Sequence, residues 1–320
     1  MSVVPTEQPA TGEIQGKHRA ELRFPENPGN RQHALRRWKE RCLLRSIQPL
    51  RLCRPRYQQA FGIITYHQVA AAPSRRRDML NVTPERFRQQ MDGLLRLGYE
   101  PWSLRRVLEY DRAGEPIPRE VFVVVFDDGF ENVYLNAWPV LRQLGIPATV
   151  FLATAYLGQE QPFPFDTWTD ADARICAPEA WRPLSLTQCH EMLDSGLIEL
   201  GTHTHTHQDF RQRPAEFELD LKRSLRLLEE EFGVTEPTFS FPYGFVEPKL
   251  VSAAKRLGVR CGLTANCGLV LPASNPFSWG RFGAVEFDNA QSLAAKLDGW
   301  YSRAREIWRV LRRPMVPANA

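Results

Sequence analysis

The chain has 320 residues, of which 43% are hydrophobic and 24% are charged, and its formal net charge is +4. This composition is typical of soluble globular proteins and excludes a wholly disordered or membrane-embedded chain. The charge is too small to indicate a nucleic-acid partner. The six cysteines are scattered and form no Cys-x-x-Cys pair, so neither a zinc ribbon nor a disulfide scaffold is indicated.

Residues 1–33 are polar and rich in proline and glycine, and they show no apolar periodicity. Such a composition predicts a disordered tail. The tail lacks the charged-then-apolar pattern of a secretion signal, and no later stretch has the apolar length of a membrane span. We therefore expect a cytoplasmic protein without a signal peptide or a transmembrane helix.

Residues 34–56 form a basic amphipathic segment with eight lysine and arginine residues. Leu35, Trp38 and Cys42 fall on one face of a helix, and the arginines fall on the other. Two interpretations remain open. The helix either packs on the main domain with a solvated basic face, or it contacts an anionic membrane surface.

Residues 57–320 alternate short β-rich runs with helical patterns, which is typical of parallel strands joined by crossover helices. The expected strands are 61–66, 121–126, 148–153, 197–200, 238–241, 259–263 and 283–287. One helix is expected to begin at Thr83-Pro84 and to end at Gly98, and another, with an apolar stripe for the core, is expected over 214–232. This order predicts an α/β fold, a distorted (β/α) barrel of about seven strands that gathers its catalytic residues at the C-terminal strand ends.

A pair of carboxylates ends one of these strands. The apolar run Val121–Phe126 stops abruptly at Asp127 and Asp128. Desolvating two neighbouring acids is costly unless a cation or a shared proton offsets their repulsion. The pair therefore indicates metal binding or acid–base catalysis, although an aspartate at a strand end also serves as a turn former or a helix cap.

Three of the seven histidines, His203, His205 and His207, fall within five residues just after the strand 197–200. Imidazoles four residues apart can converge on one ion in a tight turn, and two histidines with one carboxylate leave open positions for water and substrate. His205 is expected to point elsewhere. The alternative is an ordinary polar loop.

Three motifs follow one another at successive strand ends: Phe-Asp-Asp-Gly at 126–129, His-Thr-x-x-His at 203–207 and Pro-Tyr-Gly at 242–244. In this order they resemble the polysaccharide deacetylase family with the NodB-homology fold, carbohydrate esterase family 4. The resemblance covers about residues 61–287. The joint occurrence of the motifs is far more specific than any one of them.

The resemblance implies a role for each motif residue. Asp127 would be the general base, and Asp128, His203 and His207 would bind a divalent metal, for which Zn²⁺ is expected. The backbone N–H of Tyr243 would bind the oxyanion of the tetrahedral intermediate.

The chain departs from the family pattern twice. The arginine that normally precedes the Pro-Tyr pair is missing, and no histidine follows His207 to supply the catalytic acid. The chain resembles a subgroup whose first strand ends in Tyr-His, here Tyr66-His67. The resemblance implies that His67 is the acid and that Arg281 orients Asp127. The alternatives are a histidine that only caps its strand and an arginine without a catalytic role.

The connection 154–184 is long for a barrel and carries several aromatic residues. Long loops in compact domains are often functional. Phe165, Asp166 and Trp168 are therefore expected to contact the substrate, as is Tyr243. The alternative is that these aromatics only pack the loop.

The resemblance implies metal-dependent hydrolysis of N-acetyl groups from amino sugars of a polysaccharide or its precursor, in exopolysaccharide or envelope glycan biogenesis. An N-acetylated glycan is then the expected partner. Two alternatives remain. One is a glycan-binding or assembly protein with weak catalysis on the same fold. The other is an iron oxygenase, because two histidines and one carboxylate also bind non-haem iron.

Overall fold

The computed structural model describes residues 59–71, 80–166 and 176–311, together with Trp38, Cys42, Leu43 and Ser46, and it describes side chains up to Arg305. The chain divides into two compact units, Met1–Glu40 and Arg41–Ala320. Trp38 is the described residue of the first unit, and it is helical and exposed.

The two N-terminal segments expected from the sequence are largely beyond this description. The predicted tail 1–33 lies outside the described residues, as does most of the basic segment 34–56. Contact of that segment with a membrane stays a prediction. None of the described helices is both long and apolar enough to span a membrane.

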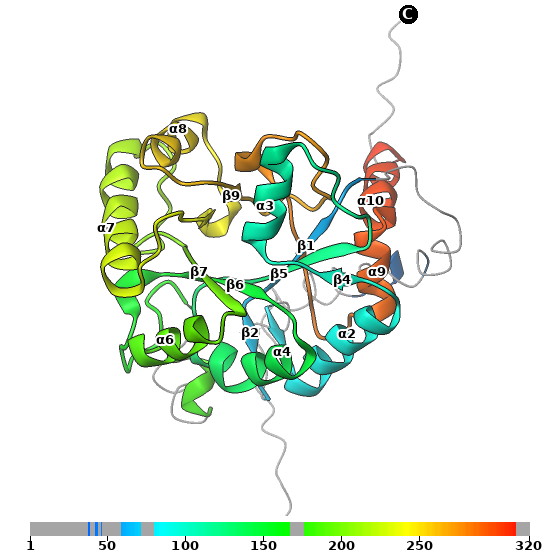
Figure 1. Ribbon diagram of the computed structural model, residues 1–320, viewed down its shortest axis with the longest axis horizontal. Coiled ribbons are helices and arrows are strands. Elements are labelled where there is room, and N and C mark those ends of the chain that lie inside the picture. Colours follow the sequence, from blue (N-terminus) through cyan, green and yellow to red (C-terminus); the bar gives the residue numbers. More distant parts are fainter. Residues whose placement is uncertain are drawn as a thin grey trace, which may run out of the picture. The chain divides into compact units, whose positions relative to one another are not determined.

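The second unit is built on one parallel sheet of eight strands (Figure 1). In spatial order these are β10 (Phe282–Gly283), β1 (Gly62–Tyr66), β5 (Val121–Phe126), β6 (Ala148–Leu152), β7 (Ile198–Thr202), β8 (Phe239–Ser240) and β9 (Gly262–Leu263), with β4 (Glu100–Pro101) paired to β5. The last strand thus lies beside the first, which is the arrangement that curls a sheet into a barrel.

Backbone hydrogen bonds draw the two ends of this sheet together. The Thr264 N–H, just after β9, donates to the Trp279 carbonyl at 2.8 Å, and the Arg281 N–H donates to the Asn266 carbonyl at 2.8 Å. Arg281 leads directly into β10. The predicted distorted barrel is therefore confirmed. A separate small sheet pairs β2 (Gln68–Val69) with β3 (Asn81–Val82).

Helices alternate with the strands and lie around the sheet (Figure 1). They are α2 (Pro84–Arg96), α3 (Leu104–Ala113), α4 (Trp138–Leu144), α6 (Leu186–Asp194), α7 (Pro214–Phe232), α8 (Pro248–Arg256), α9 (Ala290–Leu297) and α10 (Trp300–Leu311), with a π-helix η2 (Val133–Ala137) and short 3₁₀ turns η3 (Thr154–Tyr156), η4 (Pro178–Ala180), η5 (Pro242–Gly244) and η6 (Pro276–Ser278). The predicted start of α2 is confirmed, because the Thr83 hydroxyl accepts the Arg86 N–H. The predicted helix 214–232 is confirmed as α7.

Side chains along β5 alternate between two hydrophobic clusters. Phe122, Val124 and Phe126 pack with residues of α2, α4 and α9 on the outside of the sheet. The intervening valines, 121, 123 and 125, pack with Ile63 of β1 and with residues of α3 and β9, and so fill the inside of the barrel. Because alternate residues of a strand share a face, Asp127 continues the inward row. The period of two in the sequence therefore aims this carboxylate into the barrel.

The seven predicted strands all occur, in the order that a barrel requires, but the last three, β8, β9 and β10, are shorter than expected and have two residues each. Of the predicted run 283–287 only Gly283 belongs to β10. Beyond it the chain turns, because the Asp288 carboxylate accepts the Val285 N–H at 3.0 Å and Gln90 donates to the Val285 and Asp288 carbonyls. The strands β2, β3 and β4 have two residues each, too few to give a periodic pattern.

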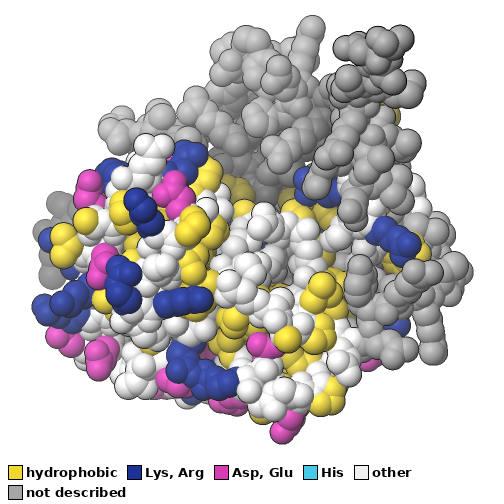
Figure 2. Space-filling model, turned by 90° about the horizontal axis from the view of Figure 1, so that it is seen from above, with side chains coloured by type: hydrophobic (Ala, Val, Ile, Leu, Met, Phe, Trp, Pro, Cys, Tyr) yellow, Lys and Arg dark blue, Asp and Glu magenta, His cyan; other side chains and the backbone are white. Residues whose placement is uncertain are grey.

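Surface charges contribute little to the stability of this fold. On the face seen in Figure 2, basic and acidic side chains of the described residues are interspersed. Exposed pairs such as Arg213–Glu216 and Arg226–Glu230 are typical of this surface. Pairs of this kind contribute at most about 1 kcal/mol each. The core and its few buried charges matter more.

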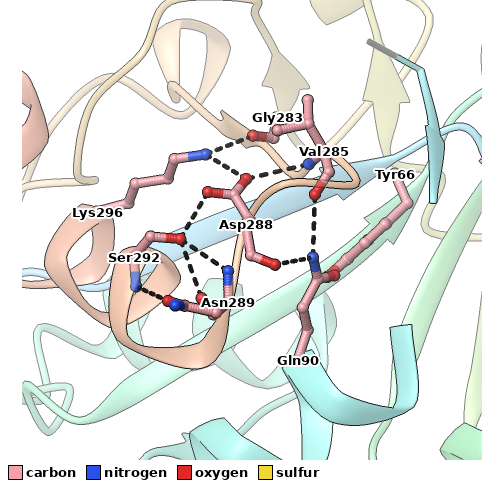
Figure 3. Close-up of polar contacts among 8 residues, drawn as sticks. All are labelled: Tyr66, Gln90, Gly283, Val285, Asp288, Asn289, Ser292 and Lys296. Carbon is pink, nitrogen blue, oxygen red and sulfur yellow. Dashed lines mark hydrogen bonds and ion pairs between the residues drawn. The ribbon is translucent and has the colours of Figure 1, made fainter. Parts of the chain in front are cut away.

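The ion pair between Asp288 and Lys296 of α9 is deeply buried (Figure 3). The Lys296 ammonium lies 2.7 Å from the Asp288 carboxylate and also donates to the Gly283 carbonyl at 2.9 Å. The Ser292 hydroxyl and the Val285 N–H donate to the same carboxylate. Lys296 thus donates both to the end of β10 and to the turn that follows it, which fixes β10 against α9.

We expect Lys296→Met to lower the free energy of unfolding by about 3 kcal/mol or more, because it leaves the Asp288 carboxylate buried without its cation. Urea denaturation measures the change. Lys255→Met is the matched control, since Lys255 is exposed and contacts only the Phe277 ring among the interactions described for it. The control should lose at most about 1 kcal/mol. Equal losses in the two variants would contradict the role of the buried pair.

Candidate active site

Segments that leave the C-terminal ends of four strands meet at one end of the barrel. His67 follows β1, Asp127 and Asp128 follow β5, the histidine loop begins at His203 after β7, and η5 with Tyr243 follows β8. Because the strands are parallel, their C-terminal ends share one edge of the sheet. Chain order alone therefore brings these side chains into one region.

Three buried side chains form a compact group of potential metal ligands. One ligand atom from each of Asp128, His203 and His207 lies within 4.8 Å of the other two. Oδ1 of Asp128 is 3.5 Å from Nε2 of His203 and 3.5 Å from Nε2 of His207. Such converging donors, two imidazoles and a carboxylate, suit a divalent cation with open positions.

The protonation of the two histidines fits this role. Nδ1 of His203 lies 2.7 Å from the Ser240 carbonyl, which can only accept, so Nδ1 carries the proton and Nε2 keeps its lone pair. Burial lowers the pKa of His203. Burial, together with the neighbouring His203, lowers the pKa of His207 to about 2. Both rings are therefore neutral at neutral pH, and neutral imidazole is the form that ligates metals.

Strained backbone conformations gather at this group. Asp128, Thr204, His207 and Tyr243 have φ angles of 73°, 67°, 52° and 57°, in the left-handed region. A residue other than glycine adopts that region at a cost of about 1 kcal/mol or more. The Thr204 hydroxyl accepts the His207 N–H at 3.0 Å, and the Asp128 carbonyl accepts the Ala153 N–H at 3.2 Å. These hydrogen bonds help to offset the strain.

A buried carboxylate outside the predicted set holds the histidine loop. Asp220 of α7 accepts the N–H groups of His205 at 2.6 Å and Thr206 at 3.2 Å, and it also accepts the Thr206 hydroxyl. Ser224, one turn further along α7, lies 2.6 Å from the Thr202 hydroxyl. Both polar residues interrupt the buried apolar face of α7 four residues apart. Two polar residues within an apolar stripe are therefore the sequence signal for this support of the histidine loop. A prediction from the apolar residues of the helix alone missed it.

Asp127 lies beside the ligand group and is held by an arginine. Nη1 of Arg281 donates to Oδ1 of Asp127 at 2.8 Å, while Nε donates to the Thr264 carbonyl at 3.1 Å. Nε2 of His67 lies 3.9 Å from Oδ2. Burial alone would raise the pKa of Asp127, but nearby positive charge, chiefly that of the Arg281 guanidinium, more than offsets it and brings the pKa below its ordinary value. The carboxylate is therefore ionised at neutral pH.

Aromatic rings border the ligand group. The Phe165 ring stacks on the His207 ring with centroids 3.9 Å apart, and the Tyr243 ring meets His207 edge-on at 4.8 Å. Tyr243 is 49% exposed, so its ring faces solvent next to the ligands. Asp166 is half-buried beside Phe165, and Trp168 lies outside the described residues. The loop thus contributes at least one ring to the wall of the site.

Most of the residues singled out in the sequence lie in this one region. They are His67, Asp127, Asp128, Phe165, His203, His207, Tyr243 and Arg281. His205 points away from the ligand group, and its Nδ1 lies 3.0 Å from the Thr154 hydroxyl. Asp127 and Asp128 are neighbours in the chain but meet different partners. The Asp127 carboxylate accepts a hydrogen bond from an arginine, and the Asp128 carboxylate lies beside the two imidazoles.

We expect Asp220→Ala to weaken Zn²⁺ binding by about tenfold or more, because the loop between the two histidines loses the carboxylate that fixes its shape. Competition with a chromophoric chelator measures the affinity. Asp220→Asn should lose less, since its amide oxygen still accepts a hydrogen bond. Glu230→Ala is the control on the same helix, where the Glu230 side chain is 68% exposed. Unchanged affinity in Asp220→Ala would refute this role.

Part of the chain matches a known protein family. Residues 114–262 match the family model described as polysaccharide deacetylase. Poly-β-1,6-N-acetyl-D-glucosamine N-deacetylase of Staphylococcus aureus is 25% identical over 232 residues, which cover 70% of this chain and 74% of the relative. The protein of the same name from Staphylococcus epidermidis is 26% identical over 229 residues, 69% of this chain and 73% of the relative.

Solved structures share the fold. The deacetylase PplD of Streptococcus pyogenes, in complex with acetate, matches with a TM-score of 0.63 and 22% identity, over 75% of this chain and 99% of that one. IcaB from Ammonifex degensii matches with a TM-score of 0.62 and 24% identity, over 76% of this chain and 99% of that one. Residues 114–262 of the chain are therefore similar to the polysaccharide deacetylase family, and the chain shares the fold of solved deacetylases.

Proposed function

We propose that this protein hydrolyses the N-acetyl groups of a β-1,6-linked N-acetylglucosamine polymer, as a step in exopolysaccharide biosynthesis. The family that part of the chain matches and the staphylococcal relatives named as N-deacetylases of that polymer support the reaction and the substrate. The observation that carries the proposal is the buried Asp128–His203–His207 group beside the ionised Asp127. Amide hydrolysis needs a base and an electrophile in that relation.

The ion that we propose for this group is Zn²⁺. Two neutral imidazoles and one carboxylate with open positions are the ligand set of catalytic zinc. When bound there, the ion would polarise the acetamide carbonyl and lower the pKa of water. Asp128, His203 and His207 would hold it, and the Ser240 carbonyl would keep the His203 ring in the required tautomer.

Asp127 is proposed as the general base. Its carboxylate is ionised, buried and adjacent to the ligand group, so it can take a proton from the water that attacks the acetamide carbon. Arg281 occupies one carboxylate oxygen, Oδ1. The other, Oδ2, faces His67. Arg281 therefore orients the base without carrying the proton itself, because a guanidinium does not deprotonate in this range.

His67 is proposed as the acid that protonates the leaving amine, and the Tyr243 N–H is proposed as an oxyanion donor. The His67 side chain is 25% exposed and reaches to within 3.9 Å of Asp127, so substrate can approach it. Imidazole titrates near pH 6.5, which suits proton delivery at neutral pH. Tyr243 lies at the rim with a left-handed backbone, next to the His207 ring.

The sugar is proposed to contact the aromatic border of the site. Tyr243 has an exposed ring that contacts the His207 ring, and the Phe165 ring stacks on the same histidine. Asp166 follows Phe165 and could accept hydrogen bonds from sugar hydroxyls. Trp168 keeps its predicted contact with substrate as part of the same proposal.

Two other functions are less well supported. An iron oxygenase could use the same ligand set, but similarity to the family and the adjacent ionised Asp127 favour hydrolysis. A weakly catalytic glycan-binding protein would have no use for a buried base held by an arginine, because that arrangement costs desolvation energy. Iron content and acetate release distinguish the three.

We expect acetate release from β-1,6-linked N-acetylglucosamine oligomers to stop with a chelator and to return with Zn²⁺. Asp127→Asn should keep its metal and lose turnover by about 10²-fold or more, because only the base is removed. His207→Ala should lose metal affinity, because a ligand is removed. Metal content and acetate release are measured on both variants. Equal metal loss would place Asp127 among the ligands, and full activity of metal-free protein would overturn the proposal.

We expect His67→Ala to slow acetamide hydrolysis by about 10²-fold while leaving metal content unchanged. An activated acetate ester, such as p-nitrophenyl acetate, should lose far less, because its leaving group needs no protonation. Rates on both substrates are compared across the same pH range. Losses of equal size on the amide and the ester would return His67 to a structural role.

A further inference from the structure

The chain just beyond His67 is held by two asparagine side chains. The Val69 N–H donates to Oδ1 of Asn132 at 2.8 Å, and the Val69 carbonyl accepts from Nδ2 of Asn136 at 2.8 Å. On the other edge of β2, the N–H groups of Gln68 and Ala70 donate to the carbonyls of Leu80, just before β3, and Val82, within it. The two asparagines therefore satisfy the edge of β2 that no strand covers among the described residues.

A π-helix presents both asparagines on one side. Asn132 directly precedes η2, and Asn136 lies within it. The Trp138 N–H donates to the Val133 carbonyl, five residues back. Pro139 follows and has no backbone N–H. The wider turn of the π-helix therefore costs no additional hydrogen bond at that position. Single π-turns inside helices are frequent at functional sites.

Asn132 also joins this contact to the catalytic strand end. It is fully buried and lies five residues after Asp127 on the same segment. Its Nδ2 donates to the Glu179 carbonyl at 2.9 Å, so both ends of the amide are occupied. The N–H of Asp127 donates to the Tyr66 carbonyl at 3.0 Å. Tyr66, just before His67, and Val69, two residues after it, are thereby tied to the segment that carries Asp127.

Direct contact between His67 and Asp127 does not set their separation. Nε2 of His67 and Oδ2 of Asp127 are 3.9 Å apart, which is too far for a hydrogen bond. The backbone from Tyr66 to Val69 carries the imidazole, so the position of this backbone contributes to that separation. A shift of about 1 Å in a reacting group costs up to about 10²-fold in rate.

We propose that Asn132 and Asn136 are positioning residues that hold the His67 imidazole opposite Asp127 through the backbone of Val69. The inference rests on the proposed role of His67 as the acid. It follows that losing either asparagine lowers the rate of amine protonation and leaves metal binding and substrate affinity unchanged.

The test uses Asn136→Ala and Asn136→Asp in the full-length protein. Alanine removes the donor to the Val69 carbonyl, and aspartate keeps the shape but replaces the donor with an acceptor. Both should lower kcat for acetamide hydrolysis by about tenfold, with KM and metal content unchanged. The rate on p-nitrophenyl acetate should change by less than about twofold. Asn136 is only half-buried, which makes it a safer target than Asn132.

Tyr134→Phe is the matched control on the same π-helix, because it removes the hydrogen bond to Glu191 and leaves Val69 untouched. It should change neither rate. Adding Asn136→Ala to His67→Ala should cause no further loss, because the acid that the asparagine positions is already absent.

Two failures can be told apart. If His67→Ala slows the amide selectively but the Asn136 variants slow neither substrate, or slow both equally, the asparagines serve only the fold and the inference is overturned. If His67→Ala itself slows amide and ester equally, the proposed acid is wrong, and the inference fails with it.

Discussion

Burial of two adjacent carboxylates is the constraint on which this site depends. Asp127 and Asp128 are 2% and 5% exposed, and two desolvated negative charges on neighbouring residues each need a compensating cation. The left-handed backbone at Asp128 turns the chain between them, so the two side chains meet different partners. Arg281 supplies the charge for Asp127. The histidines beside Asp128 are neutral and supply none, so the metal ion proposed for this group would compensate that charge.

The scaffold around the site consists of buried polar groups on outer helices. Asp220 holds the loop between the two histidines, and Asn132 holds the chain beyond His67. Each side chain lies beside irregular backbone that follows a strand. The N–H groups of that backbone have no strand partner and need other acceptors. The same polar side chains that satisfy the backbone also fix the reacting groups. Stability and catalytic geometry are therefore coupled at these positions.

The sequence predicts the barrel and most of the site because their signals are local. The period of two along Val121–Phe126 and the histidine spacing at 203–207 both lie within a few residues, and the strand order does the rest. The roles of Asp220 and Asn132 could not be predicted in this way, because each is a single polar residue whose partner lies in another segment. The end of β10 could not be predicted for the same reason, since a distant carboxamide, that of Gln90, and a turn carboxylate stop the strand.

The place of Arg281 in the chain has a consequence for biosynthesis. Synthesis runs from the N-terminus, so Asp127 and all three potential metal ligands leave the ribosome well before the arginine does. Until β10 arrives, the edge of β1 that it pairs with is bare and the base has no guanidinium beside it. A nascent chain that stops after β9 thus has all three potential metal ligands but lacks the arginine that orients Asp127, the proposed base. The segment that closes the barrel, Arg281 and β10, thus also completes the proposed catalytic site.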